Sequence, residues 1–490
     1  MKFVKGLMLG STAVLMATAA QAADLPLKAK AVEYVKVCSL YGAGFYYIPG
    51  TDTCIKLGGY TRAETAFNAS GMTETPAWNG AAGQQNRLAN TTISRVRQDL
   101  NIDTRTATEY GVVRTYFDSV FTWTTGDAVA GGSLGVYFAF VQFAGFTFGK
   151  AVSQFSTPWN GAPGNITSNL LGGDDTSTGV NQVSYTAEFG NGVSGSISLE
   201  DQSSYRQAQG VSSVFNTSGL GGTNTPATWL SGAGVGTSYT AGTQIPDIVG
   251  KVRVDQAWGL FQVSAAAHQI RASYYNPSLE TSGHPDDKWG YAVLAALSLK
   301  NLPTGPGDSI NLDATYADGA IRYVIGGTSP NNFSMYGNGA IGAYQTIAIG
   351  SAVDGLFTTG GGIETTKAWG IRGAFNHNWT PQWATSIFGA YSSVDFGSAG
   401  GALYTTGLRN AVGGTFVGNP NFNIAQIGTR TAWTPVKNLT LSGEVIYTRI
   451  DQNYTGNTGA VNPGATKPTA VYQFKDQDTW TGAVRVQRTF

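Results

Sequence analysis

The amino-acid sequence predicts an all-β chain that closes into a sixteen-stranded antiparallel transmembrane β-barrel. Three observations predict this fold. The chain has little charge and no helix-length apolar segment after its first twenty residues. Polar and apolar residues alternate with a period of two in segment after segment. The connections between these segments alternate between short and long.

The composition excludes the common alternatives. Charged residues make up 12% of the chain, aromatic residues another 12%, and 66 of the 490 residues are glycine. A soluble protein of this size needs more charge on its wetted surface, and a helical membrane protein needs long apolar spans. The strands of a transmembrane barrel turn one face to lipid and the other to water, so such a barrel needs neither a highly charged surface nor long apolar spans. A formal net charge of zero also gives no reason to expect a nucleic-acid partner.

The first residues have the pattern of a secretory signal peptide. Lys2 and Lys5 precede an apolar run over 6–20, and Ala20-Gln21-Ala22 matches a cleavage site. A membrane anchor is the alternative, but the apolar run is too short to span a bilayer. We therefore expect a signal peptide over 1–22, a periplasmic N-terminal segment over 23–53, and the barrel over 54–490.

Cys38 and Cys54 are the two cysteines of the chain. In an exported protein they are expected to form a disulfide, the alternative being two free buried thiols. Two cysteines and three scattered histidines are too few for a metal site. We expect neither a metal nor a cofactor.

The clearest strand covers 93–105. Val96, Leu100 and Ile102 share one face, and the opposite face is charged at almost every step. Similar alternation over 54–68 and 110–123 places further charges on the inward side. The expected basic wall residues are Arg62, Arg95, Arg97 and Arg114, and the expected acidic ones are Asp99, Asp103 and Asp118. Bases and acids are nearly balanced on the predicted inward faces, so their numbers indicate no ion preference.

The connections predict the strand count. Short turns such as 107–109 and 190–192 alternate with long polar connections such as 202–246, 318–363, 397–421 and 451–477. Short turns at one end and long loops at the other are typical of outer-membrane barrels. The predicted strands are 54–68, 91–105, 110–123, 133–143, 145–152, 179–189, 193–201, 247–257, 259–272, 288–300, 309–317, 364–378, 383–396, 422–433, 439–450 and 478–490.

Two aromatic features accompany the strands. Trp and Tyr gather near strand ends, for example Trp289, Trp383 and Trp480, as in a headgroup belt. The hairpin at 136–150 is apolar on both faces and places Lys150 on the outside. Either a bulge shifts its register or this wall meets protein, and we favour a contact between subunits.

The chain resembles the alphaproteobacterial porins, general outer-membrane porins of Rhizobiales type. The resemblance rests on Val35-Lys36-Val37-Cys38, on the block from Ile48 to Tyr60, on the hairpin from Phe140 to Lys150, and on the last seven residues. It implies a homotrimer in the outer membrane with a third loop folded into the lumen. It also implies contact with lipid and lipopolysaccharide, and recognition of Phe490 by the barrel-insertion machinery.

By this resemblance, the segment 153–178 narrows the pore. Its carboxylates Asp174 and Asp175 would face the arginines of the first three strands across the lumen and create a transverse field that favours polar solutes. The alternative is that both are ordinary solvated loop carboxylates. A sixteen-stranded barrel is too wide for side chains to fill, so a passive, water-filled channel for ions and small hydrophilic solutes is the expected function.

An enzyme is not expected. Gly131-Gly132-Ser133-Leu134-Gly135 fits a hydrolase motif but lies before a strand, where no nucleophile elbow forms. The glycine motif over 337–342 lacks the helix that a dinucleotide site requires. The remaining alternatives are a substrate-specific channel, or a barrel used mainly for adhesion or anchoring. Most aromatic residues have outward parity, which favours a general pore over a sugar channel.

Overall fold

The computed structural model describes residues 36–70, 75–166, 170–206, 213–218, 225–232, 239–325, 332–338, 345–464 and 466–490. The predicted signal peptide, 1–22, lies outside these residues. Among the residues described, no helix is both long enough and apolar enough to cross a membrane.

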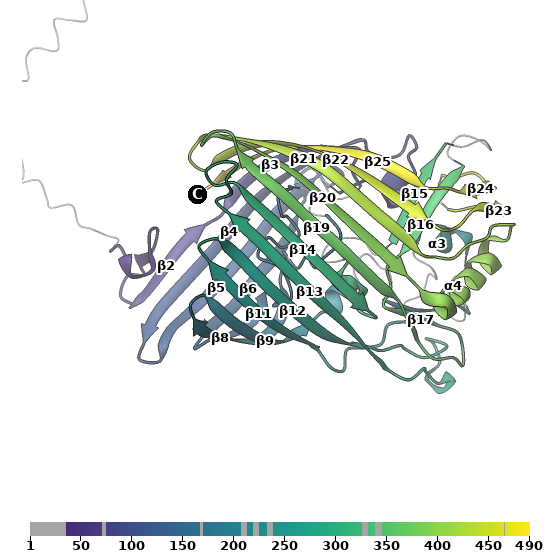
Figure 1. The fold of residues 1–490 in the computed structure, drawn as a ribbon, viewed down its shortest axis with the longest axis horizontal. Helices are drawn as coiled ribbons and strands as arrows, with labels where there is room; N and C mark the ends of the chain where they lie inside the picture. Colours follow the sequence, from purple (N-terminus) through teal and green to yellow (C-terminus); the bar gives the residue numbers. More distant parts are fainter. Residues whose placement is uncertain are drawn as a thin grey trace, which may run out of the picture.

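Sixteen antiparallel strands of the described chain form a closed barrel (Figure 1). Each strand is hydrogen-bonded to the next, and the last closes onto the first, with Arg485 opposite Glu64. The barrel strands are β3 (Tyr60–Phe67), β4 (Thr92–Thr108), β5 (Gly111–Thr124), β6 (Ser133–Phe143), β7 (Phe146–Ala151), β8 (Val180–Gly190), β9 (Val193–Asp201), β11 (Asp247–Gln256), β12 (Gly259–Ile270), β13 (Lys288–Lys300), β14 (Ser309–Asp318), β19 (Lys367–Asn378), β20 (Trp383–Asp395), β21 (Phe422–Val436), β22 (Leu439–Gln452) and β25 (Gln477–Thr489). The predicted strand number and order are confirmed.

The first predicted strand is interrupted. β2 (Thr53–Gly58) and β3 both pair with β4, and Gly59 between them has a φ of 148°. A side chain at this position would approach the carbonyl oxygen of Asp99 to 2.2 Å. Glycine is therefore required where the wall bends between β2 and β3.

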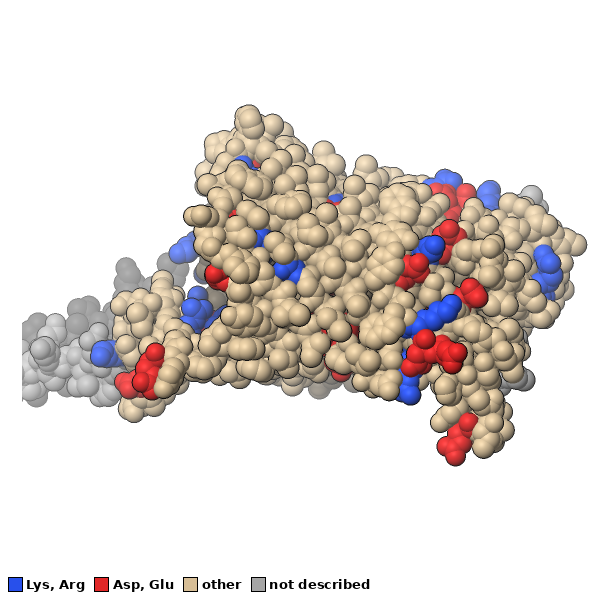
Figure 2. Space-filling view, turned by 60° about the horizontal axis from the view of Figure 1, so that its bottom comes forward, with Lys and Arg blue, Asp and Glu red and all other residues tan. Residues whose placement is uncertain are grey.

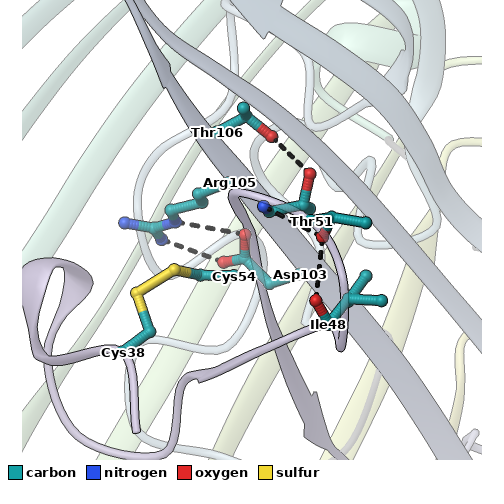
Figure 3. The surroundings of a disulfide bond; sticks show 8 residues. Cys38, Ile48, Thr51, Cys54, Asp103, Arg105 and Thr106 are labelled. Carbon is teal, nitrogen blue, oxygen red and sulfur yellow. Dashed lines mark hydrogen bonds and ion pairs between the residues drawn. A yellow bond between two sulfur atoms is a disulfide. The ribbon is translucent and has the colours of Figure 1, made fainter. Parts of the chain in front are cut away.

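The disulfide between Cys38 and Cys54 is confirmed, with 6.0 Å between the two Cα atoms. It ties the short helix η1 (Ser39–Tyr41) and β1 (Tyr46–Tyr47) to β2, at the short-turn end of the barrel. Figure 3 shows the disulfide beside Asp103 and Arg105 of β4, with Thr106 nearby. The Arg105 guanidinium lies 5.0 Å from the centre of the Phe45 ring. The segment is thus fastened to the extended part of β4.

The long connections are folded at the opposite end (Figure 1). We call the elements at that end the cap. They include α3 (Pro226–Leu230), β15 (Asn332–Gly337), β16 (Thr346–Ser351), β17 (Gly355–Phe357), α4 (Gly397–Val412), β23 (Gly456–Val461) and β24 (Ala470–Phe474). The long connection predicted over 397–421 contains a four-turn helix, Gly397–Val412, which the sequence did not reveal because its glycine, alanine and threonine residues give little apolar periodicity. The remaining short elements are α1 (Gly80–Gly83), α2 (Ser203–Arg206), β10 (Val214–Asn216), η3 (Glu280–Ser282), η4 (Ile321–Tyr323) and β18 (Glu364–Thr365).

A hydrophobic core holds the cap together. Trp229 of α3 contacts Tyr404 of α4 edge to face at 5.0 Å, and both are fully buried. The same cluster continues downward to inward side chains of the wall, such as Leu294 of β13 and Ile450 of β22. Apolar side chains therefore fill the long-loop end along these strands.

The outer surface has the polarity of a membrane-spanning wall. Figure 2 shows one face on which charged residues gather toward the two ends and leave a mostly uncharged middle. Tryptophans predicted for the aromatic belt are exposed, among them Trp289, Trp383 and Trp480. Trp383 stacks on Trp433 of the neighbouring strand at 5.6 Å. This distribution is the one that a lipid bilayer with two headgroup layers favours.

The disulfide yields a first prediction. Replacing Cys38 and Cys54 by serine removes a cross-link that restricts the unfolded segment, worth about 3 kcal/mol in the chain-entropy model. We expect faster proteolysis within 36–58 and an intact barrel, as measured by limited proteolysis of the folded protein followed by mass spectrometry. Dithiothreitol should reproduce the effect in the wild type. Equal cleavage rates in variant and wild type would contradict the prediction.

Candidate functional site: the inner wall of the barrel

The inner wall begins with the alternation along β4. Val96 is 48% exposed on the outer side, whereas its neighbours Arg95 and Asp99 are buried inside. Residues paired across antiparallel strands point to the same side of the sheet. Arg62 is paired with Arg97, and Arg105 with Arg114, so all of them share the inner side. The predicted wall residues therefore have the parity that the sequence indicates.

The segment 153–178 follows β7 and crosses the inside of the barrel. Its described parts hydrogen-bond to inward side chains of ten wall strands. Those side chains are Gln182 (β8), Glu200 (β9), Lys251 (β11), Gln262 (β12), Asp313 (β14), Arg372 (β19), Ser386 (β20), Gln426 (β21), Glu444 (β22) and Arg485 (β25). We call 153–178 the lumen segment. It contacts the wall from β8 to β25 with its own backbone and side chains.

A buried ion pair anchors the lumen segment. Arg372 and Asp313 have fully buried side chains, and the Arg372 Nε lies 2.8 Å from Asp313 Oδ1. The same guanidinium donates to the carbonyl oxygens of Gly173, at 3.1 Å, and Asp174, at 2.7 Å. The Trp159 indole donates to the other Asp313 oxygen at 2.6 Å. One arginine thus binds the wall and the loop together, a role that the sequence did not reveal.

The prediction that Asp174 and Asp175 face the arginines of the first three strands is wrong. Both carboxylates are buried, 3% and 5% exposed. The arginines whose positive charges act on them are Arg372 and Arg322, which do not belong to the first three strands. The lumen segment packs against the wall and buries both carboxylates. Within the segment, the Ser156 hydroxyl donates to Asp174 and the Ser177 backbone N–H donates to Asp175. The two carboxylates line no open passage.

Burial controls the protonation of these loop groups. It raises the pKa of Asp174 to about 7, with further upward contributions from Asp175 and Glu200 that Ser156 and Arg372 partly oppose. Burial also raises the pKa of Asp175 and lowers the pKa of Arg322, in η4, to about 10. Near neutral pH, the Asp174 carboxyl is therefore partly protonated.

Most of the other predicted wall charges are paired. Arg95 and Arg485 both bind Glu64, while Arg105 and Arg114 both bind Asp103 at 2.9 and 3.0 Å. Asp99 accepts a hydrogen bond from Asn101, and Asp118 accepts one from Tyr116. Cross-strand ion pairs of this kind neutralise the wall locally. The exceptions among the predicted arginines are Arg62 and Arg97, for which the described residues provide no ion pair.

The stretch of wall from β3 to β7 contributes no hydrogen-bond partner to the lumen segment within the described residues. Its inward side chains include buried charged groups, such as Arg95 and Asp99, and partly exposed ones, such as Arg97. Five partly exposed rings are also among them, which sequence reasoning missed as lumen residues. They are Tyr60, Tyr116, Tyr137, Phe138 and Phe140. The pairing between β5 and β6 slips at Tyr137, where Asp118 faces Phe138 but Ser119 faces Val136. A bulge is therefore present in the hairpin, but the hairpin remains apolar on both faces, since Phe138 and Phe140 lie inside and Val141 is exposed outside.

Comparisons with known proteins agree with this geometry. A family model described as a porin subfamily matches residues 24–483. Porin Omp2b of Brucella suis biovar 1 (strain 1330) is 31% identical over 270 residues, covering 52% of this chain and 63% of that protein. Omp2b of Brucella abortus (strain 2308) has the same identity and coverage. The chain thus matches less than two thirds of the length of these relatives.

Among solved structures, the outer membrane channel DcaP of Acinetobacter baumannii is similar to the barrel. The TM-score is 0.56 at 15% sequence identity, covering 91% of this chain and 99% of that one. At this identity the similarity concerns the fold alone.

Arg372→Met tests the anchor. The substitution leaves Asp313 buried without its cation, which costs roughly 3–5 kcal/mol for a buried pair. We expect a lower temperature of barrel unfolding, measured by heat-dependent migration in denaturing gels, and faster hydrogen exchange in 153–178. Arg253→Met is the control, because its pair with Asp255 is partly exposed and is worth at most about 1 kcal/mol. Equal losses in both variants would refute the anchor.

The raised pKa of Asp174 predicts a pH dependence. The folded segment favours the protonated carboxyl, so its contribution to stability is complete below the ordinary pKa of 3.8 and is lost as pH rises through about 7. Hydrogen exchange in 153–178, corrected for its intrinsic pH dependence, should be slower at pH 5 than at pH 8. Asp174→Asn should remove most of this difference, and an undiminished difference in that variant would rule out Asp174 as its source.

Proposed function

Because the chain belongs to the porin subfamily, we propose that it forms a passive, water-filled diffusion channel for ions and small hydrophilic solutes. The resemblance identified in the sequence is thereby confirmed at the level of the family, and this family resides in the bacterial outer membrane. One observation carries the proposal. The inner wall from β3 to β7 presents partly exposed arginines and aromatic rings, among them Arg97, Arg114 and Tyr116, which form no hydrogen bond with the described lumen segment.

A channel requires a wall that water can wet and a bounded width. Sixteen strands enclose more space than wall side chains fill. The lumen segment and the apolar core below the cap occupy the side lined by β9 to β22. We therefore propose that solutes pass on the other side, between the lumen segment and the wall from β3 to β7. This path is displaced from the barrel axis.

Family and fold favour a channel over an enzyme. Ser133 of the hydrolase-like motif begins β6 and pairs with Thr122 of β5, so it lies in a strand and not in an elbow between strand and helix. Two of the histidines are engaged by carboxylates, His268 by Asp247 and His377 by Asp308. Neither the strand position of Ser133 nor the contacts of these two histidines supports a hydrolase site at the Gly131–Gly135 motif.

We also propose that the channel is a homotrimer whose contact includes the outer face of β6 and β7. Phe146 and Phe148 are exposed there and stack on each other at 5.7 Å. Lys150 shares this face, and its Nζ donates to the Val136 carbonyl oxygen at 2.6 Å beside the bulge. A lysine on a lipid-facing wall is unfavourable, whereas a protein contact can accommodate it.

The remaining partners stay predictions. Outer-membrane lipid and lipopolysaccharide fit the uncharged middle of the outer wall. Recognition by the insertion machinery would use Phe490, whose side chain is 59% exposed at the short-turn end.

Planar-bilayer recordings test the channel. The purified protein should produce stepwise increases in conductance that scale with bulk salt conductivity, and neutral sugars should permeate in order of size without saturation. Saturable block by one sugar would replace the general pore by a substrate-specific channel. A complete absence of steps would favour a barrel used for adhesion or anchoring.

Gel electrophoresis tests the trimer. Unheated samples extracted in mild detergent should migrate as a trimer and convert to a monomer on boiling. Lys150→Glu places a negative charge on the proposed contact and should lower the temperature of this conversion. Lys300→Glu serves as control, since Lys300 lies at the end of β13, away from β6 and β7. A lone monomer band in the unheated wild type would overturn the trimer.

A further inference from the structure

Two arginines of the inner wall face each other, and neither forms an ion pair with a described residue. Arg62 of β3 is the direct cross-strand partner of Arg97 of β4. Like charges in this position repel each other. Within the described residues no carboxylate lies within the 4 Å of an ion pair from either guanidinium, although neighbouring arginines of the same strands are paired with Glu64 and Asp103.

The hydrogen bonds of the two guanidinium groups are incomplete. Arg62 donates from Nε to the Gln487 side chain at 2.9 Å. The Nε of Arg97 is shielded from solvent and has no hydrogen-bond partner. Asp99 on the same face attracts both guanidinium groups without forming an ion pair with either, and its Oδ1 accepts a hydrogen bond from Asn101 at 3.2 Å. Each guanidinium therefore keeps donors for a further acceptor.

Aromatic rings flank this pair. The Arg62 guanidinium carbon lies 4.4 Å from the centre of the Tyr60 ring, and that of Arg97 lies 5.9 Å from the Tyr137 ring. Tyr137 is the bulged residue of β6, and the bulge is what turns its side chain inward. The four side chains come from β3, β4 and β6, and the side chain of Arg97 approaches Tyr137 across β5, which lies between β4 and β6. Together they form one surface of cations and flat rings.

The facing lumen segment supplies no compensating charge. Its only acidic residues are Asp174 and Asp175, and both are buried against the opposite wall. Its more exposed described residues include Pro158, Trp159, Asn160 and Ala162, which carry no charge. The described part of the lumen segment therefore adds no negative charge to the path beside Arg62 and Arg97.

We propose that Arg62, Arg97, Tyr60 and Tyr137 form a binding station for small carboxylates that carry a flat apolar body. A carboxylate accepts paired hydrogen bonds from guanidinium groups and relieves their mutual repulsion. A planar body stacks on the tyrosine rings. The station rests on the proposed channel function and adds to it a preference for anions and a solute class.

The experiment uses the full-length mature protein in planar bilayers. Reversal potentials in a KCl gradient measure ion preference, and block of the ion current is titrated with benzoate, acetate and the neutral benzamide. The wild type should prefer chloride to potassium. Benzoate should block saturably and roughly tenfold more strongly than acetate or benzamide, the ratio expected when one partner group is lost.

Variants separate the contributions. Arg62→Gln with Arg97→Gln should weaken benzoate block by roughly tenfold or more and shift the reversal potential toward cations. Tyr137→Leu should remove the preference for benzoate over acetate, whereas Tyr137→Phe should retain it. Arg253→Gln is the matched control, because it also removes an inward positive charge but one already paired with Asp255.

The outcomes are distinguishable. Normal conductance steps with unchanged benzoate block in the double arginine variant would overturn the station and leave the channel intact. Equal effects of the double variant and Arg253→Gln would also overturn it, since overall charge would then explain the result. An absence of steps in the wild type would instead remove the channel itself.

Discussion

Closure of the backbone ladder between β25 and β3 is the constraint on which the rest of the structure depends. In a bilayer an unpaired backbone amide or carbonyl is costly, so a sheet that spans it must have no free edge. The pairing of Arg485 with Glu64 in register completes the circle. Closure also divides every strand into an outer and an inner face. The charged residues of β4 can be inward only because the apolar ones between them are outward.

Inside the circle, ion pairing decides which charges remain available to solutes. Arg372 and Asp313 bind the lumen segment, Glu64 is shared by two arginines, and Asp103 by two more. These groups stabilise the wall and the loop while neutralising one another. Since many of these charges form ion pairs, the numbers of acids and bases along the strands say little about the electric field in the passage. That field depends on which cations form no ion pair.

The cap makes the barrel asymmetric. Its core around Trp229 and Tyr404 extends to inward apolar residues such as Leu294 and Ile450. The lumen segment joins the same core through Phe155 and Leu171. Apolar burial thus fills the side of the mouth lined by β11 to β22, and the half-exposed polar wall lies on the other side. The long connections are part of the folded molecule and share its hydrophobic core.

The sequence by itself determined the sixteen strands, their facing and the disulfide. These depend on local information: a period of two, turn residues, and one pair of cysteines in an exported chain. It did not determine the helix at Gly397–Val412, whose small residues carry little periodic signal, or the inward turn of Tyr137, which results from a one-residue slip between strands. Only the tertiary structure decided that Asp174 and Asp175 are buried beside Arg372 and that Arg62 and Arg97 form no ion pair with a described residue. The physical reason is that an ion pair joins residues distant in sequence. A strand pattern shows on which face a charge lies but not which charge the folded chain brings to meet it.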